Sequence, residues 1–175
     1  MENLRNPRVL GTQYRVYDKD GKYKRTIDKT DEKNLDESDW LKGVTCFVIN
    51  EKGEVLIEVR ANKGLTPGKN DLCSGHLDND ETETQAMVRE LKEETGAVDF
   101  NIKPVCVYSV KGKTCVNENA AKESFGMLYA AEIFSFEEIH SEIEKIVLSD
   151  DLIRQWTYPL IQPKLISEAK KRGYL

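Results

Sequence analysis

The chain has 175 residues, of which 39% are hydrophobic and 33% are charged, and its formal net charge is −5. This length suits one domain rather than two, and the balance of apolar and charged residues is typical of a folded globular protein. The acidic charge argues against a nucleic-acid polymer as the main partner, and the lack of a run of about 18 apolar residues argues against a membrane span.

The N-terminal residues and the cysteines give an expectation for the compartment. The segment MENLRNPRVLGTQYR has no apolar stretch of the kind that a secretory signal needs, so we expect a cytoplasmic protein. The four cysteines form no CxxC pair, and we interpret them as reduced thiols that mostly serve packing. They are Cys46, Cys73, Cys106 and Cys115.

The first third of the chain predicts two β-hairpins. Residues 14–27 form two strand-like runs around Asp20-Gly21, which is a good hairpin turn. Residues 44–60 form a second pair of runs, rich in β-branched and apolar residues, on either side of a short turn. The polar segment between the two pairs reads as a loop. Residues 1–40 are therefore expected to form an N-terminal hairpin and loop.

The rest of the chain alternates between the patterns of helices and strands. A loop marked by glycine and proline follows the second hairpin, and no internal repeat or low-complexity linker is present. We expect a helix at 82–95, strands at 103–110 and 125–133, a short strand near 146–148 within helical sequence, and a C-terminal helical segment at 150–175. This alternation predicts an α/β fold with a mixed sheet, in one domain over residues 1–175.

The helix expected at 82–95 has two faces. Met87, Val88 and Leu91 form an apolar stripe that suits packing on a sheet. Three glutamates lie beside this stripe at positions i, i+3 and i+4, where side chains are neighbours and like charges repel. One nearby arginine cannot neutralise three carboxylates, whereas a divalent cation with oxygen ligands can. A solvated helix face is the alternative interpretation of the same glutamates.

The spacing of residues around these glutamates decides between the two interpretations. The fixed residues are Gly75, Glu81, Arg89, Glu90, Leu91, Glu93, Glu94, Gly96 and Ala97. This spacing resembles the complete signature of the Nudix hydrolases, the Nudix box, over residues 75–97. Counting seven of these positions as fixed, each with a background near 5–10%, a chance match is on the order of 10⁻⁸ per starting position. Residues 42–76 also resemble Nudix members in which an arginine, a lysine and a Pro-Gly pair precede the box.

The resemblance implies a fold, an activity and a set of site residues. It implies a Nudix-type α/β/α sandwich that hydrolyses a nucleoside diphosphate linked to another moiety, or a related organic pyrophosphate, with Mg²⁺ or Mn²⁺. By position in the box, Glu90, Glu93 and Glu94 are the expected metal ligands, with the carbonyl of Ser74 as a further ligand. Glu81 is expected to support the metal shell, often through water, and Arg89 to orient the glutamates. Either Glu90 or Glu94 could act as the general base.

Residues outside the box provide weaker candidates. Glu142 is at about the right distance to be a further acidic ligand, and Glu138 and Glu144 compete with it for this role. Arg60, Lys63 and Lys69 could reach substrate phosphates, although ordinary solvated loop residues are an equal alternative. His76 follows the box glycine and is expected at the mouth of the site. Four aromatic residues could stack on a substrate ring or belong to the core: Phe125, Tyr129, Trp156 and Tyr158.

Two other functions share this fold and remain alternatives. The segment LCSGHL resembles the isopentenyl-diphosphate isomerases, but Ser74 stands where those enzymes carry a cysteine, and their boxes are degenerate. A non-catalytic Nudix-like domain that binds a nucleotide metabolite is the second alternative. The substrate itself is not indicated, because we find no motif of the NADH, coenzyme A or ADP-ribose branches. We expect a small-molecule pyrophosphate as partner, no membrane, and a homodimer as one candidate assembly.

Overall fold

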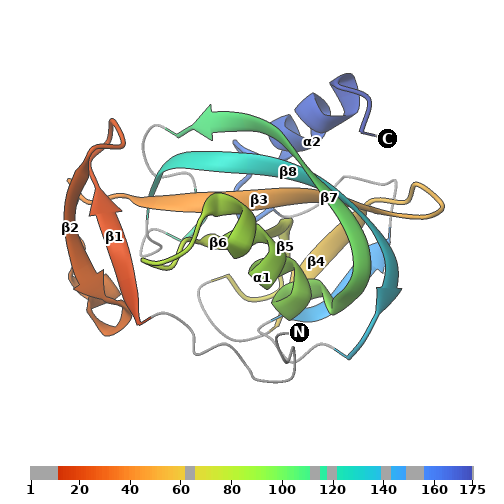
Figure 1. Ribbon diagram of the computed structural model, residues 1–175, viewed down its shortest axis with the longest axis horizontal. Coiled ribbons are helices and arrows are strands. Elements are labelled where there is room, and N and C mark those ends of the chain that lie inside the picture. The colour runs from red at the N-terminus through yellow and green to blue at the C-terminus, as the bar shows by residue number, and fades with distance from the viewer. Residues whose placement is uncertain are drawn as a thin grey trace.

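The computed structural model combines a series of strands with two α-helices and a short 3₁₀ helix (Figure 1). It describes residues 12–61, 66–110, 115–117, 122–138, 143–148 and 156–174, and only the backbone of 123–124 and 143–148. The elements are β1 (Gln13–Tyr17), β2 (Tyr23–Asp28), the 3₁₀ helix η1 (Lys29–Asn34), β3 (Leu41–Asn50), β4 (Leu56–Arg60), β5 (Asn70–Asp71), β6 (Cys73–His76), α1 (Glu83–Thr95), β7 (Ala97–Ser109), β8 (Glu123–Phe136), β9 (Ile143–Leu148) and α2 (Gln162–Lys171).

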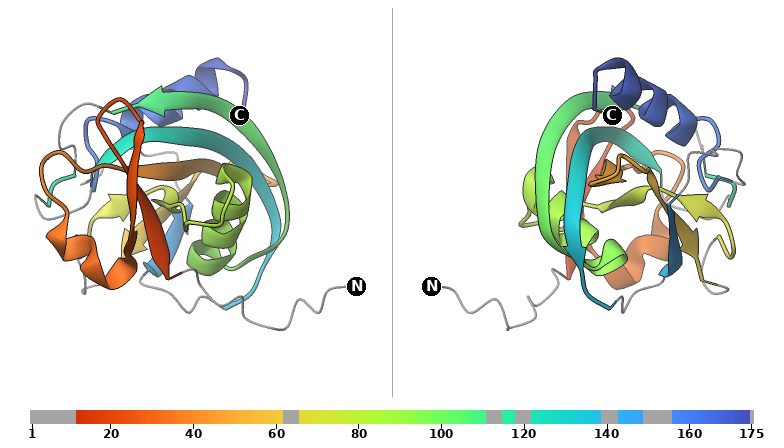
Figure 2. Two further views of the ribbon diagram at one scale, coloured as in Figure 1. Left: turned by 60° about the vertical axis from the view of Figure 1, so that its left-hand side comes forward. Right: turned by 90° about the vertical axis from the view of Figure 1, so that its right-hand side faces the viewer.

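The strands form a four-stranded sheet, a three-stranded sheet and a separate hairpin. The four-stranded sheet has the order β6-β3-β8-β7; β3 and β8 pair in parallel, and the other pairs are antiparallel. The smaller sheet has the order β5-β4-β9 and is antiparallel. The long strands β7 and β8 curve around α1 in the two turned views (Figure 2). The expected mixed sheet is confirmed.

Two apolar clusters attach the helices to opposite faces of the four-stranded sheet. Met87 and Leu91 of α1 pack with Val44 and Cys46 of β3 in one cluster. In the other cluster Leu165, Ile166 and Ala169 of α2 pack with Phe47 of β3 and Leu128 of β8. Because successive side chains of a strand point to opposite faces, β3 supplies both cores from adjacent positions. The helix–sheet–helix layering expected of an α/β/α sandwich is therefore present.

Local sequence signals set both ends of α1. The Thr82 hydroxyl accepts a hydrogen bond from the backbone N–H of Gln85, and the Gln85 side chain accepts one from the backbone N–H of Thr82, which forms a capping box. At the other end Gly96 adopts φ 72°, a left-handed conformation that glycine adopts at little cost. The start and the end expected from the sequence are both confirmed.

The N-terminal hairpin forms as expected, and the segment that follows is more ordered than expected. Strands β1 and β2 pair in antiparallel fashion across the turn at Gly21. The segment interpreted as a loop contains η1, so that interpretation was wrong in part. Arg25 of β2 donates to buried Asp39 at 2.7 Å, and this ion pair ties the end of the segment back to the hairpin.

The prediction of a second hairpin was wrong about which strands pair. Its turn is present, since the Asn50 side chain accepts from the backbone N–H groups of Lys52 and Glu54. Beyond one isolated bridge, Ile49 to Val55, the two strands separate, and β4 joins β5 and β9 instead of β3. Strand β3 obtains its partners from β6 and β8. The sequence pattern predicted the positions of both strands, but each of them pairs mainly with strands more distant in the sequence.

The last third contains less helix than expected. Residues 135–136 belong to strand β8 rather than to a helix, and the short strand expected near 146–148 extends over Ile143–Leu148. Strand pairing outweighed helical propensity here, because residues 135–136 pair with β7. The expected C-terminal helix is present as α2, and residues 149–155 lie outside the described part of the chain.

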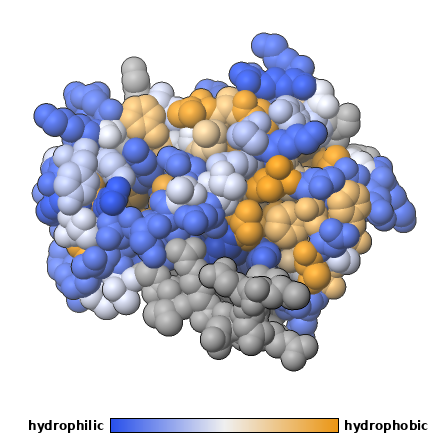
Figure 3. All heavy atoms as spheres, viewed as in Figure 1, coloured by the Kyte–Doolittle hydropathy of each residue, from blue (hydrophilic) through white to orange (hydrophobic). Residues whose placement is uncertain are grey.

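The face shown in Figure 3 divides into a hydrophilic and a more apolar side. Apolar side chains gather on the right of this face, where β7 and β8 curve around α1 (Figure 3). Val98 and Val107 of β7 and Phe134 and Phe136 of β8 are among the exposed large hydrophobic residues. Neither of the described helices has the length and apolar character needed to cross a membrane.

Replacing Thr82 by alanine tests the helix cap. Loss of the hydroxyl leaves the backbone N–H of Gln85 without its capping acceptor, so the free energy of unfolding should fall by about 1 kcal/mol. Denaturant unfolding followed by circular dichroism measures this change. Thr82→Ser keeps the hydroxyl and should remain close to the wild type; an equal loss in both variants would contradict the role of the cap.

Candidate metal centre

The box folds as a strand end, a loop and a helix that brings its glutamates beside β6. Gly75 on β6 faces Glu90 on α1 so closely that a Cβ atom at position 75 would lie 2.1 Å from Glu90 Oε1. Only a residue without a side chain allows this approach. The box glycine is thus explained by the packing of α1 against β6.

Arg89 connects the loop and the helix through several hydrogen bonds. Its guanidinium donates to both carboxylate oxygens of Glu81, at 2.7 and 2.9 Å, and to Glu90 Oε1 at 2.6 Å. It also donates to Glu93 Oε2 at 3.3 Å and to the carbonyl of His76 at 3.2 Å. Burial opposes the charge of Arg89, but the bond to Glu81 and the charge of Glu90 outweigh burial and raise its pKa. Arg89 therefore joins the loop residue Glu81 to two of the box glutamates, Glu90 and Glu93.

Glu81 has hydrogen-bond partners both on helix α1 and on the loop before it. Its side chain is buried, and besides Arg89 it accepts from the backbone N–H of Asp78 at 3.0 Å. Asp78 is itself buried and forms an ion pair with Lys29, which follows strand β2. Arg15 of β1 also donates to the side chain of Asn79 at 2.8 Å, so η1 and the N-terminal hairpin both hold the loop that carries Glu81.

The three box glutamates of α1 have different environments. Glu94 points into the protein, is only 4% exposed, and accepts from the backbone N–H of Ser74 at 3.0 Å. Glu90 is mostly buried, and burial raises its pKa from 4.5 to about 7. The Glu93 side chain is 42% exposed. The helix thus arranges the three carboxylates from the interior to the surface.

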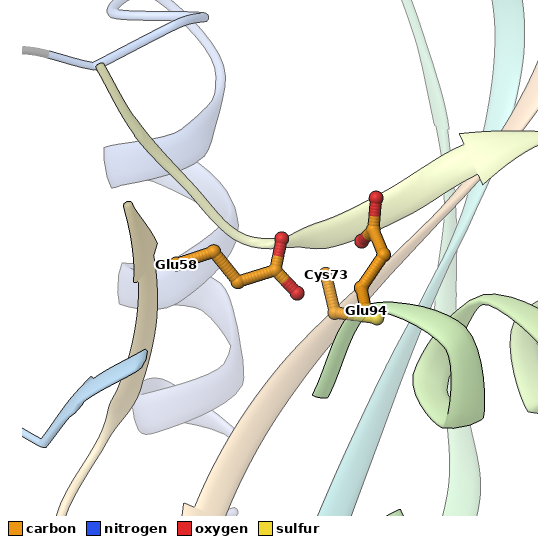
Figure 4. A group of neighbouring side chains, drawn as sticks. All are labelled: Glu58, Cys73 and Glu94. Atoms are coloured by element: carbon orange, nitrogen blue, oxygen red, sulfur yellow. The ribbon is translucent and has the colours of Figure 1, made fainter. Parts of the chain in front are cut away.

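A fourth glutamate, which the sequence reasoning missed, lies beside Glu94. Glu58 of β4 is fully buried, and neither of its carboxylate oxygens has a hydrogen-bond donor in the part of the chain that the structure describes. Its carboxylate lies next to Cys73 and Glu94, with one potential ligand atom from each of the three residues within 4.8 Å of the others (Figure 4). Burial, with the charge of Asp71 second, raises the pKa of Glu58, and burial, with the charge of Glu58 second, raises that of Glu94. The available signal was an acidic residue within the apolar run VLIEV.

Asp71 of β5 extends this buried acidic group. It accepts from Arg60 at 3.2 Å and from the side chain of Gln162 at the start of α2. Burial raises the pKa of Asp71 to about 6, although both of these bonds favour the ionised form. Arg60, expected to meet substrate phosphates, is thus engaged with Asp71 inside the site.

The remaining expected residues are placed less centrally. The carbonyl of Lys69 accepts from the backbone N–H of Arg60, and the Lys69 side chain is half-buried. The His76 ring meets Tyr14 of the N-terminal hairpin edge-on, with ring centroids 6.0 Å apart. Lys63 and Glu142 lie outside the described residues, as does the side chain of Glu144, and Glu138 is exposed.

The aromatic candidates divide between the core and the surroundings of the site. Tyr129 and Trp156 are buried members of the apolar clusters, so the core interpretation holds for them. Phe125 is partly buried and packs against Gly21. Tyr158 lines a small pocket with Ser74, Thr45 and Gln162. All four cysteines are free thiols, and Cys73 is a core residue as expected.

Comparisons with known proteins agree with this geometry. A family model for the NUDIX domain matches residues 39–157. A NUDIX hydrolase from Nitrosomonas europaea is similar in structure, with a TM-score of 0.60 and 22% identity over 76% of this chain and 90% of that one. A pyrophosphohydrolase from Bacillus subtilis gives a TM-score of 0.58 and 23% identity over 79% and 88%. An ADP-ribose pyrophosphatase from Streptococcus suis gives 0.56 and 16% over 76% and 91%.

No curated protein sequence is detectably similar to the chain. The structural likenesses, all below 25% identity, establish the fold. The family model establishes the family as well as the fold, because its match covers more than half of the chain and includes the entire box around Arg89. Together with the loop and helix that gather the box glutamates, this match shows that the protein belongs to the Nudix family.

Proposed function

We propose that this protein is a metal-dependent hydrolase of a pyrophosphate linkage in a small nucleoside diphosphate derivative or a related organic pyrophosphate. The observation that carries the proposal is the arrangement of the three box glutamates on α1. Glu94 accepts from the backbone N–H of Ser74, and Arg89, which is bound to Glu81, donates to Glu90 and Glu93. The pyrophosphatases among the structural neighbours support the reaction class.

The residues present fit a hard divalent cation. The donor set consists of carboxylate oxygens, which Mg²⁺ and Mn²⁺ prefer. Burial raises the pKa of both Glu90 and Glu94, so their negative charge is costly where it stands, and a cation would offset that cost. We assign Glu90, Glu93, Glu94 and the Ser74 carbonyl as ligands, and Glu81 as their support.

Each group has a distinct task in the proposed reaction. The bound cation would compensate the charge of the substrate and lower the pKa of the attacking water. Glu90 or Glu94 accepts the proton of that water. Arg89 keeps Glu90 and Glu93 in position through its hydrogen bonds. Lys69 and His76 are assigned to the substrate phosphates, and Arg60, although it donates to Asp71, is assigned to them as well.

The two alternatives make different predictions. An isomerase of this fold would use a cysteine at the position of Ser74, and here the cysteine is displaced to Cys73, which is buried in the core. A metabolite-binding domain would bind a nucleotide without turning it over. The cytoplasmic location, the homodimer and the single-domain organisation expected from the sequence stay predictions.

Incubation with a panel of nucleotide pyrophosphates and Mg²⁺ or Mn²⁺ tests the activity and narrows the substrate. We expect release of phosphate or of a nucleoside monophosphate from at least one member, and none after chelation of the metal. Calorimetric binding of a nucleotide without any turnover would instead favour the metabolite-binding domain. Turnover of isopentenyl diphosphate to its isomer would favour the isomerase.

Replacing Glu94 by glutamine tests the role of the box. Glutamine can still accept the hydrogen bond from Ser74 and removes a buried negative charge, so the metal-free protein should be as stable as the wild type or more stable. The rate of hydrolysis should fall by about 100-fold or more, because one metal ligand is lost. Glu93→Gln should act in the same direction.

Glu83→Gln is the matched control, since Glu83 is an exposed glutamate on the same helix and outside the signature. Its rate should stay near that of the wild type. A control that loses as much activity as Glu94→Gln would show that roles cannot be assigned from the box spacing.

The pH dependence of stability gives a test without substrate. Because the folded pKa values of Asp71 and Glu90, about 6 and about 7, lie above the usual 3.8 and 4.5, the native protein binds more protons than the unfolded chain in this window. The free energy of unfolding of the metal-free protein should therefore fall as the pH rises through 6 and 7. The pKa of Asp39 is lowered, so the stability that this carboxylate contributes is lost only below pH 3.8.

Thermal unfolding with and without Mg²⁺ measures this dependence. Bound metal should flatten it, because the cation favours the ionised carboxylates that protons otherwise neutralise. Glu90→Gln should also reduce the slope in the metal-free protein. A stability that rises from pH 6 to 8 without metal would contradict the assignment.

A further inference from the structure

The strongest unexplained feature of the molecule is Glu58. A fully buried carboxylate normally has a hydrogen-bond donor or a positive partner, because removing it from water costs free energy that must be offset. Neither oxygen of Glu58 has a donor among the described residues. The side chain extends from β4 toward Cys73 and Glu94 (Figure 4), so it is directed at the metal centre rather than at solvent.

We propose that Glu58 is a further ligand of the divalent cation, so that the metal centre of this chain is shared between α1 and the smaller sheet. The inference rests on the proposed function, because Glu94 would be a ligand together with the other box glutamates and also together with Glu58. Glu58 lies outside the box, and no feature of the box spacing requires it. What supports it is the position of its carboxylate, within 4.8 Å of potential ligand atoms of Glu94 and Cys73.

The nearby arginines already have acidic partners. Arg60 donates to Asp71, and its charge also favours the ionised form of Glu58. Arg89 donates to Glu81, Glu90 and Glu93. Among the described residues, two guanidinium groups thus serve five carboxylates, and the Glu94 carboxylate lies beside that of Glu58 in the interior. A hydrogen bond between these two is available only when one of them holds a proton, because ionised carboxylates are acceptors only.

The pair can therefore be stabilised in two ways, by a shared proton or by a cation. A cation between them satisfies both carboxylates at once. Cys73 lies within the same group, but burial raises the pKa of its thiol, and a neutral thiol is a poor ligand for a hard cation. The proposed ligand set is therefore composed of oxygens, with Cys73 as a packing residue.

This arrangement has a consequence for the fold. Glu58 belongs to the sheet β5-β4-β9, whereas Glu94 belongs to the helix that packs on the four-stranded sheet. A cation bound by both would connect the two sheets at the point where their side chains meet. Binding of the metal should then stabilise the whole protein, in proportion to the affinity that Glu58 contributes.

Titration of Mn²⁺ into the metal-free protein, followed by calorimetry, tests the proposal without any substrate. Glu58→Gln keeps the shape of the side chain, removes a buried charge and should fold. We expect its affinity for Mn²⁺ to fall by about 10- to 100-fold, the range seen when groups that support a metal are lost. The rise in melting temperature caused by Mn²⁺ should shrink accordingly. Glu132→Gln, a half-buried glutamate of β8, is the control and should bind as the wild type does.

The outcomes separate this inference from the proposed function. If Glu58→Gln binds Mn²⁺ as tightly as the wild type while Glu94→Gln does not, Glu58 is no ligand and the box site stands. If the wild type binds no Mn²⁺, both proposals fall. A loss of affinity in Cys73→Ala equal to that in Glu58→Gln would overturn the oxygen-only set.

A crystal of the wild type soaked in Mn²⁺ gives a measurement that does not depend on the folding of any variant. An anomalous peak in bonding contact with an oxygen of Glu58 and with Glu94 is the expected result. A peak held by the box glutamates alone would overturn the proposal.

Discussion

Negative charge buried between β4 and α1 is the constraint on which the rest of this structure depends. Glu58, Asp71 and Glu94 are each at most 4% exposed, and Glu90 is largely enclosed beside them. Buried carboxylates repel one another strongly because little solvent lies between them. Their raised pKa values express this cost, and the surrounding elements are arranged to limit it or to use it.

The supporting elements come from widely separated parts of the chain. Arg89 is fixed by Glu81 on the loop before α1, and that loop is fixed by the ion pair of Asp78 with Lys29. On the other side Asp71 is held by Arg60 and by Gln162 at the start of α2. The N-terminal hairpin and the C-terminal helix therefore both contribute to the same centre, although neither carries a box residue.

The rotation of α1 about its axis decides what each glutamate can do. Met87 and Leu91 must face the sheet, which turns Glu94 inward and leaves Glu93 toward the surface. The carboxylate of Glu90 occupies the space that a side chain at position 75 would need. The core packing of the helix and the geometry of the site are thus a single feature.

The sequence by itself determined the features that depend on local spacing. Residues three and four apart are neighbours on any helix, so the cluster of Glu90, Glu93 and Glu94 and the apolar stripe could be predicted together. The caps at Thr82 and Gly96 are equally local, and so is the turn of the first hairpin. The membership of the Nudix family also followed from spacing, since the box is contiguous.

Only the tertiary structure decided which strands pair and which buried groups meet. The separation of β3 from β4 could not be predicted, because the choice of strand partners depends on competition among residues far apart in the chain. Glu58 and Glu94 are 36 positions apart, one on strand β4 and the other on helix α1, so no periodicity relates them. The contact of Asp71 with Gln162 spans 91 positions. Spacing along the chain specifies neighbours on one element, whereas the burial of an unpartnered carboxylate arises only when separate elements pack together.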